Sequence, residues 1–239
     1  MGRAFEARRT AKEKRWSKMS TIFPKLLKVI TMAAKDGGDD PATNATLRTA
    51  IQNAKSQNVP KDNIEKAIGR ASAQDVENFE LHNYEGKGPH GALLYIECAT
   101  DNSTRTIANI KSYFNKADGQ VVPNGSFEFM FDRKAVFEID SEQAEGLDIE
   151  ELELELIDAG LEKVEKNEEN EIIIYGDYTS FGTLQTALEE KGMEVAKSNL
   201  KRFASSPIEL SDEEMEDVEK LLEKIEDDDD IQHVFTNIV

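Results

Sequence analysis

The residues of this chain best suited to chemistry are the cations near its N-terminus. Residues 2–28 hold nine basic and two acidic side chains, a net charge of +7, in a chain of 239 residues whose net charge is −19. The other residues therefore carry −26, so a polyanion is attracted by one end and repelled by the rest. Lys and Arg bind phosphates, and Phe5 and Trp16 offer rings on which unpaired bases stack. We expect nucleic-acid binding through Arg3, Arg8, Arg9, Lys12, Lys14, Arg15, Trp16, Lys18, Lys25 and Lys28.

Further cations continue this charge into the next segment. Arg48, Lys55 and Lys61 are included in the predicted interface, with Lys66 and Arg70 beyond them. The intervening run 58–63 can present a loop to a nucleic acid, and its residues are equally well explained as turn and cap residues. Both interpretations stay open.

Other residue types that could do chemistry have simpler explanations. The run 85–91 has neither the spacing nor the Lys-Ser/Thr ending of a phosphate-binding loop, so it is interpreted as a turn. The acid-rich run 223–230 lacks the spacing of a calcium loop and is interpreted as a solvated helix end. Polar residues at 101–106 predict a helix cap with an Arg–Asp pair.

No set of side chains predicts catalysis. The three histidines, His82, His90 and His233, have no partners at metal-ligand spacing, and Cys98 falls inside a predicted strand. We therefore expect no catalytic residues, no metal and no cofactor, and a protein that is not an enzyme. An enzyme would need an acid/base pair converging in a pocket.

Composition limits where the chain works. No apolar run approaches 18 residues, so no membrane segment is expected, and the charged N-terminus lacks the apolar core of a secretory signal. A single cysteine excludes an internal disulfide and fits a reducing compartment. We expect a cytoplasmic protein.

Hydrophobic periodicity predicts the elements that position these residues. Three short amphipathic helices are expected between residues 22 and 71, the second opening at Asp40-Pro41, followed by a polar linker at 73–81. Strands are then expected at 92–99, 119–122 and 126–131, with a helix from 103. A second unit has the order βαββαβ, with strands at 135–139, 161–165, 171–175 and 193–198 and helices at 149–158 and 180–190. A helix at 212–226 and a strand at 231–239 close the chain.

Residues 84–131 lack one helix and one strand of a ferredoxin-like βαββαβ arrangement, and the closing helix and strand supply them. The predicted fold class is therefore α+β, a small N-terminal helical bundle plus two ferredoxin-like domains, one inserted into the other. The expected segments are a basic arm at 1–21, a helical domain at 22–79, a discontinuous α+β domain at 80–132 and 204–239, and an inserted α+β domain at 133–203.

Several motifs together resemble the YebC/PmpR family, which includes the mitochondrial translational activator of cytochrome oxidase. They are Ala34-Lys35-Asp36-Gly37-Gly38, the run 58–68, Tyr84-Glu85-Gly86, Thr100-Asp101-Asn102 with Arg105-Thr106, Gly125-Ser126 with Phe129-Met130-Phe131, and the closing run 227–234. The opening Gly2-Arg3-Ala4-Phe5 differs from the Gly-His-Ser-Lys-Trp stretch of many members, so no contact is carried over from that stretch.

The resemblance implies three domains and a cytoplasmic regulator of gene expression without known catalytic chemistry. Bacterial members are described as DNA-binding transcriptional regulators, and others act on ribosomes during translation. The leading hypothesis is therefore a DNA-binding transcriptional regulator. The alternative is a ribosome-associated translation factor that contacts ribosomal or transfer RNA. The sequence assigns no oligomeric state and no effector.

Overall fold

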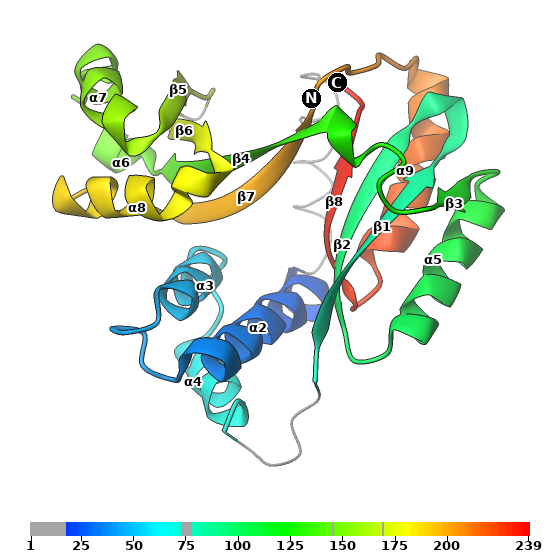
Figure 1. The fold of residues 1–239 in the computed structure, drawn as a ribbon, viewed down its shortest axis with the longest axis horizontal. Helices are drawn as coiled ribbons and strands as arrows, with labels where there is room; N and C mark the ends of the chain where they lie inside the picture. The colour runs from blue at the N-terminus through cyan, green and yellow to red at the C-terminus, as the bar shows by residue number, and fades with distance from the viewer. Residues whose placement is uncertain (1–17, 73–77, 145, 169) are drawn as a thin grey trace. The chain divides into compact units, whose positions relative to one another are not determined.

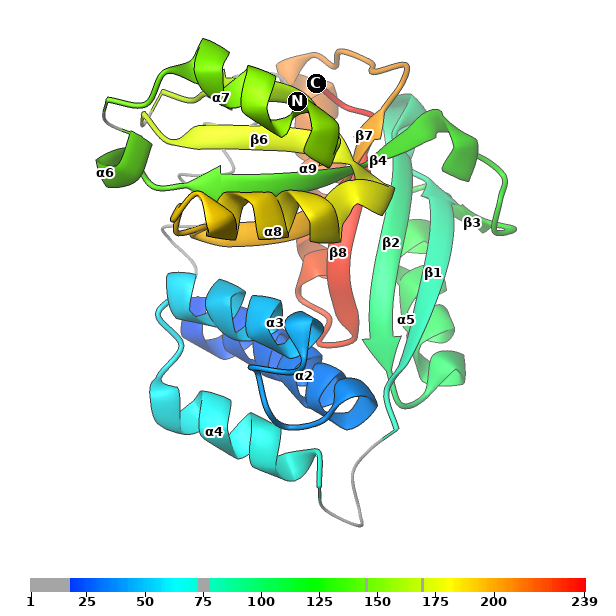
Figure 2. The same ribbon diagram turned by 60° about the vertical axis from the view of Figure 1, so that its left-hand side comes forward.

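The computed structural model describes residues 18–72, 78–144, 146–168 and 170–239 (Figures 1 and 2). Two compact units are present. Unit 1 comprises residues up to 47, 61–132 and 203–239, and unit 2 comprises residues 48–60 and 133–202. Each unit carries one four-stranded antiparallel sheet. Over the described residues, no helix is both long and apolar enough to cross a bilayer.

The first described helix, α2 (Lys18–Gly37), carries Lys25 and Lys28. Its apolar side chains Ile30, Ala33 and Ala34 are buried at helical spacing, and the helix ends where Gly38 adopts a left-handed φ of 92°. The Thr31 hydroxyl donates to the Ala67 carbonyl oxygen at 3.0 Å, which ties α2 to α4 (Lys61–Arg70).

Helix α3 (Ala45–Ser56) starts later than the sequence predicts. Asp40-Pro41 forms a preceding turn, in which the Asp40 carbonyl oxygen accepts from the backbone N–H of Asn44 at 3.0 Å. The buried Asn44 side chain then caps the helix by accepting from the Leu47 N–H at 3.0 Å. The prediction that Asp40-Pro41 opens the helix is wrong by one turn, because Asn44 is the better cap.

The sheet of unit 1 has the order β3-β1-β2-β8. Its strands are β1 (Glu80–Lys87), β2 (Leu93–Thr100), β3 (Gln120–Val122) and β8 (Ile231–Thr236). Every neighbouring pair is antiparallel, so β2 runs parallel to β3 across β1, and β1 runs parallel to β8 across β2. These are the strand directions of a ferredoxin-like sheet, with one inner strand supplied first along the chain.

Two helices cover one face of this sheet (Figure 1). They are α5 (Ser103–Lys116) and α9 (Asp212–Glu226), which bury Ile110, Phe114 and Leu221 with Leu94 and Ile96 of β2. The opposite face carries a smaller aromatic cluster of Tyr95, Phe127, Phe131 and Phe235.

Two sequence predictions for this unit are wrong. Residues 80–87 form a strand, although 73–81 was predicted as a linker and 85–91 as a turn; the turn proper is the 3-10 segment Pro89–Gly91. Residues 126–130 are not a strand, because a turn and the 3-10 segment η2 (Glu128–Met130) occupy them. This turn buries Phe127 and Phe131 but leaves Phe129 76% exposed, whereas a strand would put all three on one face.

The sheet of unit 2 has the order β5-β6-β4-β7, built from β4 (Phe131–Ile139), β5 (Leu161–Lys166), β6 (Ile172–Asp177) and β7 (Lys197–Ala204). Helices α6 (Ser141–Ala144), α7 (Ile149–Leu156) and α8 (Phe181–Glu190) complete the unit, with η3 (Ile157–Ala159) after α7 and η4 (Tyr178–Ser180) before α8 (Figure 2). Leu152, Leu156, Leu184 and Leu188 of α7 and α8 pack on Phe137 and Ile174 of the sheet.

The predicted βαββαβ order of this unit agrees with the structure, apart from β7, which lies four residues later than predicted at its start. The C-terminal part of α3 also belongs to unit 2. The Asn53 side chain accepts from the Ser198 N–H at 3.0 Å and donates to the Ser198 carbonyl oxygen at 2.8 Å. The chain is thus α+β, with N-terminal helices and two ferredoxin-like sheets. The segment that forms the sheet of unit 2 is inserted, in sequence, between segments of unit 1.

Candidate nucleic-acid interface and the acidic C-terminal run

Most of the predicted interface lies outside the described residues. This holds for Arg3, Arg8, Arg9, Lys12, Lys14, Arg15 and Trp16, and for the side chain of Lys18 at the start of α2. Binding by these residues stays a prediction.

Two predicted interface cations, Lys25 and Lys28, have partners inside the protein. The Lys25 ammonium donates to the carbonyl oxygen of Glu226 at 2.6 Å. Burial lowers the Lys25 pKa, against the opposing pull of the Glu226 carboxylate. The Lys28 ammonium donates to the carbonyl oxygens of Ala99 at 2.9 Å and Asp229 at 2.8 Å.

Lys28 also faces a carboxylate and a ring. Its Nζ lies 3.4 Å from Asp230 Oδ1, and the two side chains are only 11% and 6% exposed. The same ammonium lies 4.7 Å from the centre of the Phe79 ring, within cation–π range. Helix α2 is therefore fastened by its cations to the C-terminal acidic run, residues 226–230, which we call the clasp.

Asp230 is the centre of the clasp. Its Oδ2 accepts from the Thr106 hydroxyl at 2.9 Å, the Thr100 hydroxyl at 3.1 Å and Arg105 Nη2 at 2.7 Å. The same guanidinium nitrogen lies 2.7 Å from Asp101 Oδ1, and Asn102 caps α5. The predicted cap with an Arg–Asp pair is confirmed, and Asp230 is the partner that the sequence did not indicate.

The pKa values follow these contacts. Burial favours the neutral form of Asp230, but the hydrogen bonds from Arg105 and Thr106 and the charge of Lys28 outweigh it, so the pKa of Asp230 is lowered. The hydrogen bonds to Asp230 and Asp101 raise the pKa of Arg105 above its already high value. The Asp230 carboxylate is therefore ionised at neutral pH.

The four consecutive aspartates divide into two kinds. Asp228 Oδ2 accepts from the Tyr113 hydroxyl at 2.9 Å and from the Asn109 amide at 3.0 Å, and Asp230 is buried as described. Burial and the Asp228 hydrogen bond raise the pKa of Tyr113 to about 12. Asp227 and Asp229 are exposed. The prediction of a solvated helix end is thus wrong for alternate residues, which are structural acceptors.

The remaining predicted cations are accessible. Lys55 and Lys61 are exposed, and Lys61 pairs with Glu65 at 3.5 Å within α4. Arg48 Nε lies 3.7 Å from Glu189 Oε1, and both side chains are more than a third exposed. A surface pair of this kind contributes little stability.

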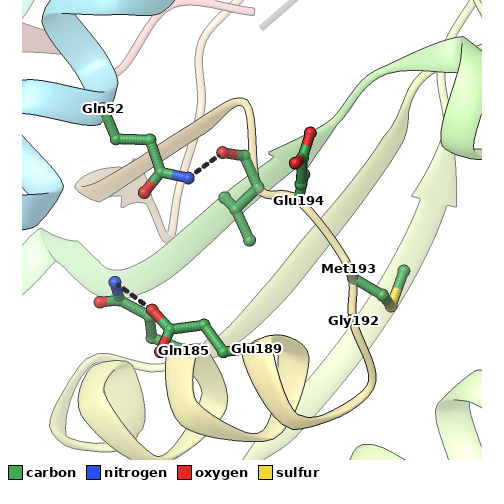
Figure 3. A pocket seen from close by; sticks show the side chains of 7 residues that line it. Gln52, Gln185, Glu189, Gly192, Met193 and Glu194 are labelled. Atoms are coloured by element: carbon green, nitrogen blue, oxygen red, sulfur yellow. Dashed lines mark hydrogen bonds between the residues drawn. The ribbon is translucent and has the colours of Figure 1, made fainter.

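A shallow hollow of unit 2 lies beside the α3 segment (Figure 3). Its volume is about 250 Å³, and its lining residues are Gln52, Gln185, Glu189, Gly192, Met193, Glu194 and Val195. The Gln52 amide donates to the Val195 carbonyl oxygen, and Gln185 donates to Glu189 at 3.2 Å. The hollow is smaller than most ligand pockets, and its polar groups already bond one another.

Cys98, the single cysteine of the chain, is buried. Burial, reinforced by Asp228 and Asp230, raises the pKa of the Cys98 thiol to about 12, so this cysteine is not a nucleophile at neutral pH. Across the described residues no three His, Cys, Asp or Glu side chains gather as a metal site.

Comparison with known proteins covers nearly the whole chain. Residues 3–74 match the model of the TACO1/YebC protein N-terminal domain, and residues 79–238 match that of the TACO1/YebC second and third domain. A protein of Wolinella succinogenes is 61% identical over 238 residues and one of Helicobacter pylori is 58% identical over 241, each match covering 100% of both chains. Both relatives are named probable transcriptional regulatory proteins.

A solved structure supports the same assignment. The crystal structure of a conserved hypothetical protein from Aquifex aeolicus is 32% identical, with a TM-score of 0.79 over 93% of this chain and 91% of that one. The two family models, the full-length relatives and this common fold agree, and the chain belongs to the TACO1/YebC family.

Proposed function

We propose that this protein is a non-enzymatic, nucleic-acid-binding regulator of gene expression that docks through its basic N-terminal region. DNA-binding transcriptional regulation is the first form of the proposal, in line with the names of its relatives. The observation that carries it is the reversal of charge along the chain, +7 over residues 2–28 against −26 over the rest. The buried free thiol fits a cytoplasmic location.

The clasp narrows the set of residues assigned to phosphate contact. Lys25 and Lys28 hold α2 in place, because their ammonium groups already have oxygen partners. Contact with nucleic acid is assigned to the arm from Arg3 to Lys18, which ends at the first residue of α2, supported by the accessible Arg48, Lys55 and Lys61. The rigid attachment of α2 would give that arm a fixed starting point.

A second form of the proposal is a translation factor docked on the ribosome. The observation that favours it is again charge: a body with −26 weakens non-specific binding to bare duplex, and Trp16 with Phe5 suits unpaired bases of RNA. A docked, geometrically specific partner tolerates such a body better than a general DNA surface does.

The test neutralises the arm and measures binding to each kind of partner. The variant replaces Arg8, Arg9, Lys12, Lys14 and Arg15 by Gln, and the matched control replaces five exposed lysines, Lys87, Lys111, Lys116, Lys163 and Lys166, by Gln. Five phosphate contacts on duplex DNA predict a salt slope of about −4.5 for the native protein, which the arm variant should lose.

Cosedimentation with ribosomes and shifts of promoter DNA separate the two forms. Promoter-selective binding lost only in the arm variant supports transcriptional regulation. Retention on ribosomes at moderate salt without promoter binding supports the translation factor. Equal binding by the arm variant and the control to every DNA and RNA partner refutes both.

A further inference from the structure

Helix α7 of unit 2 exposes large apolar side chains to solvent. Leu154 is 73% exposed and Ile157, one turn later in η3, is 56% exposed. The opposite side of the helix is fully used, since Leu152 and Leu156 lie in the core of the unit. Exposed and buried positions alternate at helical spacing, so the pair forms a patch on the outer face of α7.

Carboxylates surround this patch. Residues 148–158 contain six acidic side chains and no basic one. Three of the six have structural partners: Asp148 caps α7, Glu153 accepts from the Val164 N–H, and Glu155 pairs with Lys191.

The other three, Glu150, Glu151 and Asp158, are exposed, and within the described part of the chain their carboxylates make no hydrogen bond or ion pair. Helical spacing puts Glu150 and Glu151 one turn before Leu154 and Asp158 one turn after it. Exposed carboxylates without a described partner thus flank the two apolar side chains at both ends.

The charge decides what can cover the patch. Nucleic acid and anionic lipid surfaces are repelled by it, and a second copy of this chain would bring the same carboxylates together. A surface that buries Leu154 and Ile157 without this penalty must be positively charged around an apolar pocket. We propose that the outer face of α7 is a docking site for a basic protein surface with an apolar pocket.

This site complements the proposed function, on which it depends only for the choice of partner assemblies. A protein whose arm contacts nucleic acid and whose α7 contacts a basic protein engages both components of a nucleoprotein machine. Affinity then comes from two separated sites, so each adds to the other by raising the effective concentration.

The test uses the full-length protein and two purified probes, ribosomes and RNA polymerase core enzyme. The variant carries Leu154→Gln and Ile157→Gln. The matched control is Leu81→Gln, since Leu81 in β1 of unit 1 is 72% exposed and does not lie in a run of acidic residues as dense as that around Leu154. Thermal unfolding checks that all proteins are folded.

We expect the α7 variant to bind at least one probe at least tenfold more weakly, about the effect of losing one well-buried apolar side chain, while Leu81→Gln stays within about twofold. A second variant, Glu150→Gln with Glu151→Gln, should slow association and reduce its dependence on salt. Benzoylphenylalanine in place of Ile157 should crosslink to a protein subunit.

Unchanged affinity of the α7 variant for both probes overturns the inference. The inference is also overturned if the wild-type protein binds neither probe, or if position 157 crosslinks to RNA, to DNA or to a second copy of the chain. The arm variant described above separates the two proposals. Loss of binding in the α7 variant alone would retain this site and refute docking through the arm, and the reverse result would do the opposite.

Discussion

Removing the ammonium of Lys28 tests the clasp most directly. Lys28→Met keeps the aliphatic stem and removes the donor to the Ala99 and Asp229 carbonyl oxygens and the cation beside Asp230. Breaking a buried ion pair on one side costs about 3–5 kcal/mol. Because Arg105 and two threonine hydroxyls still hold Asp230, and the Nζ–Oδ1 distance is 3.4 Å, we expect the lower end, about 3 kcal/mol.

The loss should appear where α2 meets the sheet of unit 1. Hydrogen–deuterium exchange of the α2 peptide should accelerate about a hundredfold, since 3 kcal/mol corresponds to roughly two decades in an opening equilibrium. The control is Lys66→Met, which removes the same charge from an exposed position of α4. Equal exchange of α2 in the two variants, or a loss below about 1 kcal/mol in urea unfolding, would show that Lys28 is a surface cation with incidental neighbours.

Four further substitutions test packing, charge and capping. Gly86→Ala should destabilise by about 1–3 kcal/mol, because a Cβ there would lie 2.2 Å from the Phe114 ring, whereas Gly69→Ala, with open space in helix α4, should stabilise by about 0.5–1 kcal/mol; urea midpoints compare them. Because the pKa of Asp230 is lowered on folding, its stabilisation is fully present above pH 3.8, the ordinary pKa of an aspartate, and is lost as pH falls through the lower folded pKa. Asp230→Asn should therefore flatten the acid side of the stability–pH curve. Ser211→Ala should cost about 1 kcal/mol by removing the capping box of α9, and thermal unfolding would contradict this if the midpoint were unchanged.

Periodic segments of the sequence predict their own structure well. Unit 2 shows this, because helices α7 and α8 and three of its strands lie within a few residues of their predicted positions, whereas the short helix α6 was not predicted. The exception is β7. The segment Met193-Glu194-Val195 suggests the start of a strand, because apolar residues flank a polar one. In the structure Met193 and Val195 pack on the core before the strand begins, and the strand is Lys197–Ala204. Its lysines Lys197 and Lys201 are held by Glu138 at 2.7 and 2.9 Å, a contact that no local pattern indicates.

The prediction for the residues of β1 is wrong for a similar reason. Glu85 and Gly86 have the composition of a turn, but Glu85 is 1% exposed, and its carboxylate accepts from the backbone N–H groups of Gly125 and Phe127. Gly86 is required because Phe114 presses on it. Both causes are distant in sequence, and local propensity cannot include them.

The sequence does not indicate the contacts of the clasp either. Four identical aspartates give no signal of which two face inward, and the cations of α2 read as part of one basic segment. The sequence does predict the overall charge reversal, because net charge follows from composition without knowledge of contacts. It also predicts the Arg105–Asp101 pair, because the two residues are four positions apart in the chain.

The pairing of β2 with β8 has a consequence for how the protein is made. Tyr95 pairs with Phe235, so a growing polypeptide displays one flank of β2 until β8 has also left the ribosome. At 5–20 residues per second this wait lasts roughly 7–27 s, during which the sheet of unit 2 receives all four of its strands. The flank awaiting β8 is an open template for foreign strands, and chaperones that shield such flanks should matter most for this protein during those seconds.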